Sequence, residues 1–276
     1  MNDNLTTLSA GEIDDVIDII RLTYGYDFRD YARPSFERRI SRCMDNAGIQ
    51  GGYDLRFNLT NDPQFFAWFL QSLTVNVTEL FRDPAFYRAL REKVLPTLAS
   101  YPILKIWHAG CSTGEEVFSM AILLHEAGLL DRTRIYATDI NPANLEKARA
   151  GALPLPVCRD YALPYKLAGG RGDLADYYTE QGDLALLDRA LRRNIIFSQH
   201  NLVTDGVFNE FQLICCRNVL IYFNRALQNR AVQLFHDSLS PLGYLAIGLK
   251  ESLLFTEARS AFEAVSPTAK IYRRHQ

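Results

Sequence analysis

The sequence predicts an α/β fold of the nucleotide-binding type behind a helical N-terminal region, and two observations carry this prediction. Residues 103–124 (ILKIWHAGCSTGEEVFSMAILL) begin as an apolar run typical of a buried strand and break at Gly110 and Gly114. They resume with apolar residues at the i, i+3, i+4 and i+7 spacing of a helix. The second observation is another apolar stretch, residues 132–141 (RTRIYATDIN), which ends near Asp139. A strand, a glycine turn and a helix form the first unit of a nucleotide-binding α/β domain.

The glycine turn lacks the spacing of a phosphate-binding loop. It matches neither G-x-G-x-x-G nor G-x-x-x-x-G-K-[ST], and the helix that follows starts with Glu115 and Glu116. Two carboxylates at a helix N-terminus disfavour a phosphate there, but they suit a ligand with hydroxyl groups or positive charge. S-adenosylmethionine has both and carries no phosphate. The alternative interpretation is a well-capped helix start without a ligand.

Asp139 lies where the second strand is expected to end. An acidic residue at that point is placed to accept hydrogen bonds from both ribose hydroxyls of a nucleotide-like cofactor. The alternative is an N-cap for the next helix, which contains Pro142, Leu145 and Ala148. The glycine turn and the strand-end acid together indicate a cofactor site more specifically than either does alone.

The α/β pattern returns later in the chain. Further strands are expected at residues 193–203, 212–216, 241–249 and 270–273. Because ligands of open α/β sheets bind beyond the carboxyl ends of the strands, the residues at those ends should meet at one edge. These residues are Gly110, Asp139, Asn201, Arg217 and Asn218.

Residues 1–75 show helical patterns and no strand pattern, so we expect a small helical domain. Ser9 and Glu12 have the spacing of a capping box. A second helix, beginning near Pro34, carries Arg38, Arg39 and Arg42. These arginines fit either a solvated helix face or a docking face for an acidic partner.

Residues 76–102 are expected to form a linker helix region before the α/β domain of residues 103–276. Asn76 and Thr78 are turn and cap formers at the expected helix start, with Arg82 in its next turn. These side chains could face a ligand or could cap the linker helix. Within the α/β domain, residues 151–193 are rich in proline, glycine and tyrosine, which predicts an inserted hairpin with short helices. This insert could be a lid, a partner-binding element or a structural excursion.

Composition excludes several classes of protein. The formal net charge of −2 argues against a general nucleic-acid binder. The five cysteines are scattered without a C-x-x-C pair, which is typical of reduced residues in a cytoplasmic protein. The histidines show no ligand spacing, so no metal site is expected. We expect no signal peptide at the acidic, polar N-terminus and no span of a bilayer.

Five motifs in order resemble the CheR family of chemotaxis receptor glutamate methyltransferases: NVTELFR, GCSTGEEVFS, ATDIN, HNLV and CRNVLIYF. The resemblance covers essentially the whole chain. It departs from the family at Val77 and Leu80, and at Val117–Phe118, where the family usually has Pro-Tyr. These changes affect packing more than ligand chemistry.

The resemblance implies a Rossmann-like class I methyltransferase sheet with a small inserted β-subdomain, preceded by an all-helical N-terminal domain. It implies S-adenosylmethionine as methyl donor and S-adenosylhomocysteine as product. Arg82 and Tyr222 match positions that act near the transferred methyl group. The positions that contact the cofactor match Asn76, Thr78, Arg82, Glu116, Asp139, Asn201, Leu202, Arg217 and Asn218.

The resemblance also implies a partner, the cytoplasmic helical bundle of a methyl-accepting chemoreceptor. The N-terminal basic helix of such enzymes docks on that bundle, which favours the docking interpretation of Arg38, Arg39 and Arg42. In some members the inserted subdomain binds a receptor C-terminal peptide, but the segment AGGRGDLADYYT looks unlike those members. No nucleic acid, no membrane insertion and a monomeric state are expected.

The expected reaction is attack by a glutamate carboxylate on the sulfonium methyl group. The carboxylate is ionised near neutral pH, so no general base is required. Two alternatives stay open: a methyltransferase acting on nucleic acid or a small molecule, and a non-catalytic S-adenosylmethionine-binding adaptor of a signalling complex.

Overall fold

The computed structural model describes residues 7–74 and 76–275. Contacts between residues divide the chain into two compact units. Unit 1 comprises Met1–Val75 and Ile221–Arg230, and unit 2 comprises Asn76–Leu220 and Ala231–Gln276. Among the helices of the described residues, none has the length and apolar character needed to cross a bilayer.

Unit 1 is built from helices, as the sequence predicts. They are α1 (Ala10–Tyr24), α2 (Arg33–Ala47), α3 (Gly52–Asn61) and α4 (Pro63–Leu73). The capping box at the start of α1 forms: Ser9 Oγ accepts from Glu12 N at 3.3 Å, and Glu12 Oε2 accepts from Ser9 N at 2.9 Å. The apolar faces of the four helices enclose one buried core.

A distant piece of the chain completes unit 1. Residues 221–230 pair with the segment before α2: Ala32 N donates to Tyr222 O, and Asn224 N donates to Asp30 O, both at 2.8 Å. The rings of Tyr31 and Phe223 lie 5.2 Å apart. The segment that follows the motif CRNVLIYF therefore belongs to the helical unit by its contacts.

Unit 2 contains a seven-stranded sheet in the order β6-β2-β1-β7-β8-β10-β9. Its members are β1 (Leu104–Ala109), β2 (Thr133–Asp139), β6 (Ile195–Gln199), β7 (Phe211–Cys216), β8 (Leu239–Ile247), β9 (Phe262–Ser266) and β10 (Ile271–Arg274). The pairs among β6, β2, β1, β7 and β8 are parallel, whereas β10 is antiparallel to both of its neighbours. The predicted class I methyltransferase sheet is confirmed, with β9 as a strand that the sequence analysis did not foresee.

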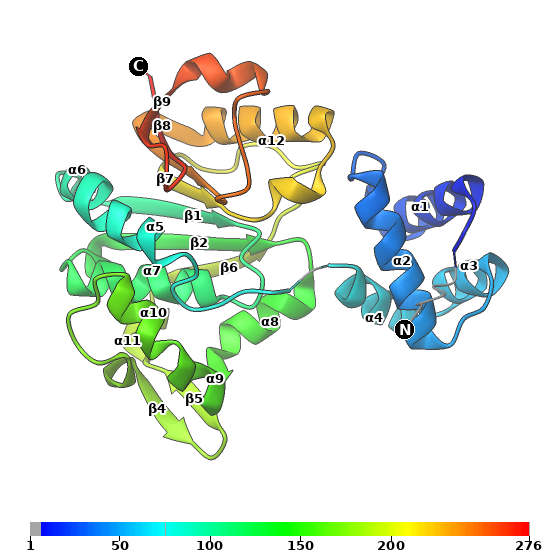
Figure 1. Cartoon of the computed structure of the whole chain (residues 1–276), viewed down its shortest axis with the longest axis horizontal. Coiled ribbons are helices and arrows are strands. Elements are labelled where there is room, and N and C mark those ends of the chain that lie inside the picture. Colours follow the sequence, from blue (N-terminus) through cyan, green and yellow to red (C-terminus); the bar gives the residue numbers. More distant parts are fainter. Residues whose placement is uncertain (1–6, 75, 276) are drawn as a thin grey trace. The chain divides into compact units, whose positions relative to one another are not determined.

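Helices connect and cover these strands (Figure 1). Helix α7 (Glu115–Glu126) follows β1 and buries nearly its whole surface, from Val117 to Leu124. The other helical segments outside the insert and residues 7–74 are α5 (Pro84–Ala89), the π-helical turn η1 (Leu90–Val94), α6 (Leu95–Leu98), η2 (Leu130–Arg132), α8 (Pro142–Ala150), η4 (Leu220–Tyr222), α12 (Arg225–Ser238) and η5 (Glu257–Ala261). Residues 221–230 of η4 and α12 belong to unit 1.

The linker helix begins later than expected. Asn76 and Thr78 were expected at the helix start, with Arg82 in its next turn, but α5 begins at Pro84. Phe81 and Asp83 have φ angles of 56° and 58°, in the left-handed region that a right-handed helix cannot use. Residues 76–83 are therefore an extended loop held by tertiary contacts, and Arg82 lies on that loop.

The insert forms a separate three-stranded antiparallel sheet in the order β3-β5-β4, so the predicted β-subdomain is confirmed (Figure 1). Its elements are β3 (Ala152–Pro154), α9 (Leu155–Asp160), α10 (Ala162–Leu167), η3 (Leu174–Tyr177), β4 (Tyr178–Gln181), β5 (Leu184–Leu187) and α11 (Arg189–Arg192). Strands β4 and β5 form the expected hairpin.

Candidate functional site

The glycine turn between β1 and α7 is the first part of the site. Gly110 has a φ of +76°, and a Cβ at this position would lie 2.5 Å from Val219 Cγ2. The backbone N–H groups of Gly110 and Cys111 both donate to Thr138 O at 2.8 Å, which joins the turn to the end of β2. Glycine is required here because a side chain would meet both an unfavourable φ and a neighbouring chain segment.

Asp139, at the end of β2, is buried and receives hydrogen bonds on both oxygens. Its Oδ2 accepts from Ser112 N at 2.8 Å, and its Oδ1 accepts from Asn141 N at 2.9 Å. The N-cap of helix α8 is Asn141, whose side chain accepts from Ala143 N, so Asp139 does not cap that helix. Burial raises the pKa of Asp139 above its usual value, although these hydrogen bonds oppose the shift.

Asn144 connects two of the predicted cofactor residues, and the sequence analysis missed it. Its Nδ2 donates to Asn76 Oδ1 at 2.8 Å and to Asp139 Oδ1 at 3.1 Å. Asn144 is 1% exposed on helix α8, beside the buried Leu145. A polar residue at a buried helix position, soon after a strand-end acid, was the available signal.

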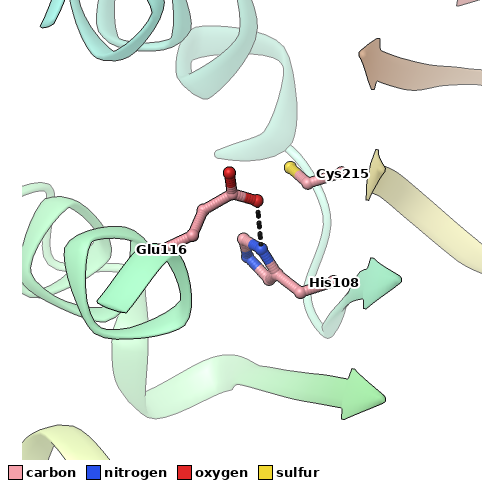
Figure 2. A group of neighbouring side chains, drawn as sticks. All are labelled: His108, Glu116 and Cys215. Carbon is pink, nitrogen blue, oxygen red and sulfur yellow. Dashed lines mark hydrogen bonds and ion pairs between the residues drawn. The ribbon is translucent and has the colours of Figure 1, made fainter. Parts of the chain in front are cut away.

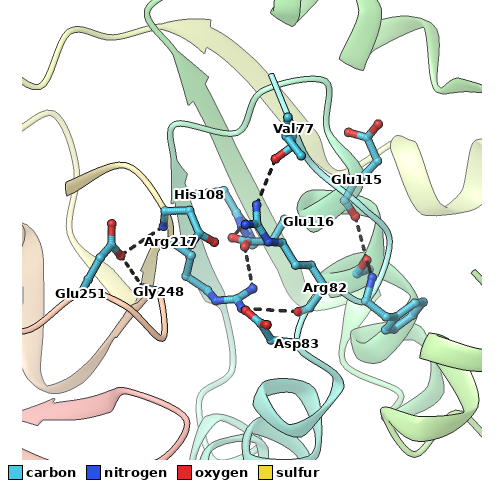
Figure 3. Close-up of polar contacts among 12 residues, drawn as sticks. Val77, Arg82, Asp83, His108, Glu115, Glu116, Arg217, Gly248 and Glu251 are labelled. Atoms are coloured by element: carbon cyan, nitrogen blue, oxygen red, sulfur yellow. Dashed lines mark hydrogen bonds and ion pairs between the residues drawn. The ribbon is translucent and has the colours of Figure 1, made fainter. Parts of the chain in front are cut away.

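Glu116, in the first turn of α7, has a partner on each carboxylate oxygen. Its Oε1 lies 2.9 Å from His108 Nδ1, at the end of β1 (Figure 2). Its Oε2 accepts from Arg217 Nη1 at 2.9 Å (Figure 3). Burial alone would raise the pKa of Glu116, but Arg217 and His108 outweigh it and hold that pKa below its usual value. Glu116 is therefore an ionised carboxylate in a half-buried position.

Arg217 follows β7 and is the centre of this polar network. Its side chain is 0% exposed, its Nη2 donates to Asp83 Oδ2 at 2.6 Å, and its guanidinium lies 4.0 Å from the ring centroid of Phe86. Burial disfavours the charge, but Glu116, Tyr87 and Asp83 raise the pKa of Arg217 above its usual value. Arg217 thus braces α7 against the loop of residues 76–83.

That loop carries Asn76, Thr78 and Arg82, which are half-buried. Arg82 Nη1 donates to Val77 O at 3.0 Å (Figure 3). Phe81 N donates to Ser119 Oγ at 2.8 Å, which fixes the loop to α7. The loop of residues 76–83 is held by α7 and by Arg217. It is therefore connected to the residues that follow β1 and β7 on the other side of the predicted cofactor site.

Three more predicted residues follow β6 and β7. Asn201 Oδ1 accepts from Val203 N at 2.9 Å in a tight turn, and Leu202 is 8% exposed. Asn218 has a φ of 62°, and its N–H donates to Glu251 Oε2 at 3.1 Å. The parallel order of β6, β2, β1 and β7 therefore places these residues along the same sheet edge as Gly110 and Asp139.

The remaining predicted residues belong to unit 1. Arg38 and Arg42, one turn apart on α2, are exposed. Arg39 instead packs inward, with its guanidinium 4.1 Å from the ring centroid of Tyr222. Its Nη1 and Nη2 donate to Leu73 O and Ser35 Oγ, both at 3.2 Å, and burial lowers its pKa. Tyr222 is thus in contact with helix α2, which the sequence did not indicate.

The residues around the glycine turn fit a polar organic cofactor. Two residues that donate hydrogen bonds to Asp139 also carry, among the described residues, a buried polar atom without a hydrogen-bond partner: Ser112 Oγ and Asn144 Oδ1. Such atoms destabilise a protein unless a ligand or water satisfies them. Hydroxyl and amino groups are what S-adenosylmethionine presents.

The fold and this edge define a class I S-adenosylmethionine-dependent methyltransferase: a parallel sheet, a glycine turn after β1 and an acid at the end of β2. Comparison with known proteins identifies the group within that class. Residues 76–271 match the family model described as CheR methyltransferase, SAM binding domain. Residues 11–74 match the model described as CheR methyltransferase, all-alpha domain. The chain belongs to the CheR methyltransferase family.

Two relatives illustrate this membership. A protein of Pseudomonas putida named Cher3 is 48% identical over 263 residues, which are 95% of this chain and 96% of that protein. The chemotaxis protein methyltransferase of Listeria monocytogenes is 32% identical over 239 residues, which are 86% of this chain and 88% of the relative. Both alignments extend over the helical unit and the sheet.

Proposed function

We propose that this chain methylates glutamate side chains in the cytoplasmic domain of a chemoreceptor, for adaptation in chemosensory signalling. The observation that carries the proposal is the match of both family models, together with relatives named chemotaxis protein methyltransferase. The polar residues at the sheet edge, with two carboxylates at the start of α7, suit a cofactor without phosphate and so support S-adenosylmethionine as methyl donor. The exposed arginines of α2 support an acidic partner.

Each predicted cofactor residue has a chemical part in this proposal. Asp139 accepts hydrogen bonds from the ribose hydroxyls, and Glu116 binds the amino group. Asn201 and Leu202 border the site beside β6, and Asn218 borders it beside β7. The remaining contacts come from Gly110, Asn76, Thr78 and Arg217. When bound, S-adenosylmethionine supplies an electrophilic methyl group that a glutamate carboxylate displaces, giving a methyl ester and S-adenosylhomocysteine.

The acceptor side requires alignment rather than a base. A glutamate carboxylate is ionised near neutral pH, so this chain has no proton to remove before transfer. We assign Arg82 to orienting the cofactor or the incoming carboxylate, and Tyr222 to aligning the methyl group and that carboxylate. Opposite charges are neutralised as the methyl group moves, so exclusion of water and near-attack geometry should contribute most.

Docking is assigned to helix α2. Arg38 and Arg42 are exposed and four residues apart, so their side chains lie on one face of the helix. An acidic helical bundle would meet this face with complementary charge, which raises the rate of encounter more than the final affinity. Arg39 supports the face from inside through its contact with Tyr222.

The deciding experiment is methylation of candidate receptor cytoplasmic domains with labelled S-adenosylmethionine. We expect base-labile label on glutamates, which peptide mapping would locate. Matched reactions with RNA and with a receptor fragment whose candidate glutamates are changed to alanine are the controls. Label that resists base, label on RNA, or cofactor binding without turnover on any receptor tested would contradict the proposal.

A further inference from the structure

His108 is a buried histidine that the proposed reaction does not use. It lies at the end of β1 and is 1% exposed, and its Nδ1 is 2.9 Å from Glu116 Oε1 (Figure 2). Glu116 is ionised and can only accept hydrogen bonds, so Nδ1 must carry the hydrogen. The geometry therefore fixes both the role of this nitrogen and the direction of the bond.

The second ring nitrogen shows that His108 is not placed for stability alone. Its Nε2 is buried without a hydrogen-bond partner among the described residues. A buried nitrogen without a partner destabilises the folded state, and a smaller or apolar side chain would avoid that loss. The favourable interaction of His108 is concentrated in its bond to Glu116.

The neighbouring Glu115 shows what a carboxylate does here without such partners. Glu115 is buried, whereas Glu116 is half-buried, and Glu115 Oε2 accepts a hydrogen bond from Thr113 Oγ1 at 2.7 Å. Burial raises its pKa, whereas the pKa of Glu116 is lowered. Arg217 and His108 account for the difference, because they hold the two oxygens of Glu116 in one orientation with its charge in place.

A metal ion is the other interpretation of this cluster, because ligand atoms of His108, Glu116 and Cys215 all lie within 4.8 Å of one another (Figure 2). The guanidinium of Arg217 already occupies Glu116 Oε2, and a cation beside it would be repelled. The cluster therefore favours a positioning role.

We propose that His108 is a positioning residue for the cofactor, acting through Glu116. Its N–H fixes the carboxylate so that the lone pairs left free by His108 and Arg217 face the positively charged amino group of S-adenosylmethionine. The inference rests on the cofactor class and on the assignment of Glu116 to that amino group. It is independent of which partner receives the methyl group.

A double-mutant cycle tests this proposal, with cofactor affinity measured by calorimetry on His108→Leu, Glu116→Gln and the double variant. We expect His108→Leu to weaken binding about tenfold, as loss of one charge-assisted hydrogen bond would. In the Glu116→Gln background the same change should weaken binding by no more than about twofold, because its effect passes through the carboxylate. Chemical denaturation of each variant checks folding.

Conservative variants provide the matched control. His108→Asn can place an N–H close to the position of Nδ1, whereas the amide of His108→Gln reaches toward the position of Nε2. We expect Asn to recover most of the affinity that Leu loses and Gln to recover little. If His108→Leu does not fold, the comparison of Asn with Gln decides instead. The proposal would be overturned by any of three results. These are an unchanged cofactor affinity in His108→Leu, a double variant whose loss of affinity is the product of the two single losses, or equal affinities of His108→Asn and His108→Gln. Receptor methylation is not read here, so failure of the proposed partner would leave this result standing.

Discussion

The arginine beside the cofactor edge and the arginines of helix α2 show opposite uses of the same side chain. Arg217 is 0% exposed and lies between two carboxylates and an aromatic ring. Arg38 and Arg42 are exposed on one helix face. Inside unit 2, charge fixes the positions of loops relative to one another. On unit 1, the charge is exposed to solvent, so position in the sequence alone does not distinguish a buried structural arginine from an exposed one.

Removing Arg217 should have the largest effect. Arg217→Met leaves Glu116 and Asp83 buried or half-buried without their cation, and breaking such a network costs about 3–5 kcal/mol in the free energy of unfolding. Urea denaturation would measure it, with Arg38→Met as the exposed control, which should change stability by less than about 0.5 kcal/mol. Equal effects of the two changes would remove the distinction between the two regions.

Asp139 tests whether the buried charges of unit 2 serve the cofactor as well as the fold. Asp139→Ala removes the proposed acceptor of the ribose hydroxyls. Because each charge-assisted bond contributes about 1.5–3 kcal/mol, cofactor affinity should fall roughly ten- to a hundredfold or more. Calorimetry with S-adenosylmethionine on the folded variant measures this. Unchanged affinity would rule out the assignment.

The same residue sets the expected pH dependence. Burial raises the pKa of Asp139 above its usual value, whereas Arg217 and His108 hold the pKa of Glu116 below its usual value. As pH falls from neutral, Asp139 is protonated in a window that begins above its usual pKa, so cofactor affinity should fall as the pH passes through this raised pKa. The stability of the cofactor-free protein has the opposite sign for this group, because folding favours its protonated form and that contribution is lost as pH rises through the raised pKa. A pH profile that is the same in Asp139→Ala would contradict the assignment.

The docking face should respond in the opposite manner. Arg38→Glu combined with Arg42→Glu reverses two exposed charges and should lower receptor methylation about tenfold at limiting receptor and low salt. Cofactor affinity and unfolding should stay near the values of the unchanged protein. Added salt should reduce the difference in methylation rate between the variant and the unchanged protein, because exposed charges are screened. Equal rates at limiting receptor would identify the face as solvated surface.

Substitution of Arg39 should have the smallest effect, because this side chain is intermediate between the buried Arg217 and the exposed Arg38 and Arg42. Its guanidinium lies over Tyr222 and donates to Leu73 O and Ser35 Oγ. Arg39→Lys keeps the charge but loses the planar fork, so stability should fall by about 1 kcal/mol. The kcat for receptor methylation is measured at saturating receptor, under conditions where the variant is folded. A fall in this kcat would show that Arg39 acts on the reaction through Tyr222. A loss of stability with unchanged kcat would show that Arg39 only contributes to packing.

The sequence predicts the turns and strand ends of the site better than the hydrogen bonds and ion pairs between its side chains. Gly110 and Asp139 were foreseen because turns and strand ends follow local patterns, and the sheet places them together. The bond between His108 and Glu116 joins a strand to a helix turn, and Arg217 reaches Asp83 across 134 positions, so no local spacing reveals them. The helix start expected near Thr78 was wrong because left-handed Phe81 and Asp83 depend on tertiary contacts with Ser119 and Arg217. Arg39 was grouped with its exposed neighbours because its partner, Tyr222, comes from the far end of the chain.

The side chain of Glu126, at the end of α7, joins the insert to helix α7 and to η1. Its Oε1 accepts from Tyr165 Oη at 2.6 Å and from Arg171 N at 3.0 Å, while its Oε2 pairs with Arg91. The β4–β5 hairpin lies beyond this attachment and exposes Glu180 and Gln181. The attachment and the outward surface are therefore separate in the structure. The exposed tip of the hairpin can therefore differ in sequence while the hydrogen bonds of Glu126 stay the same, because Glu180 and Gln181 make none of them.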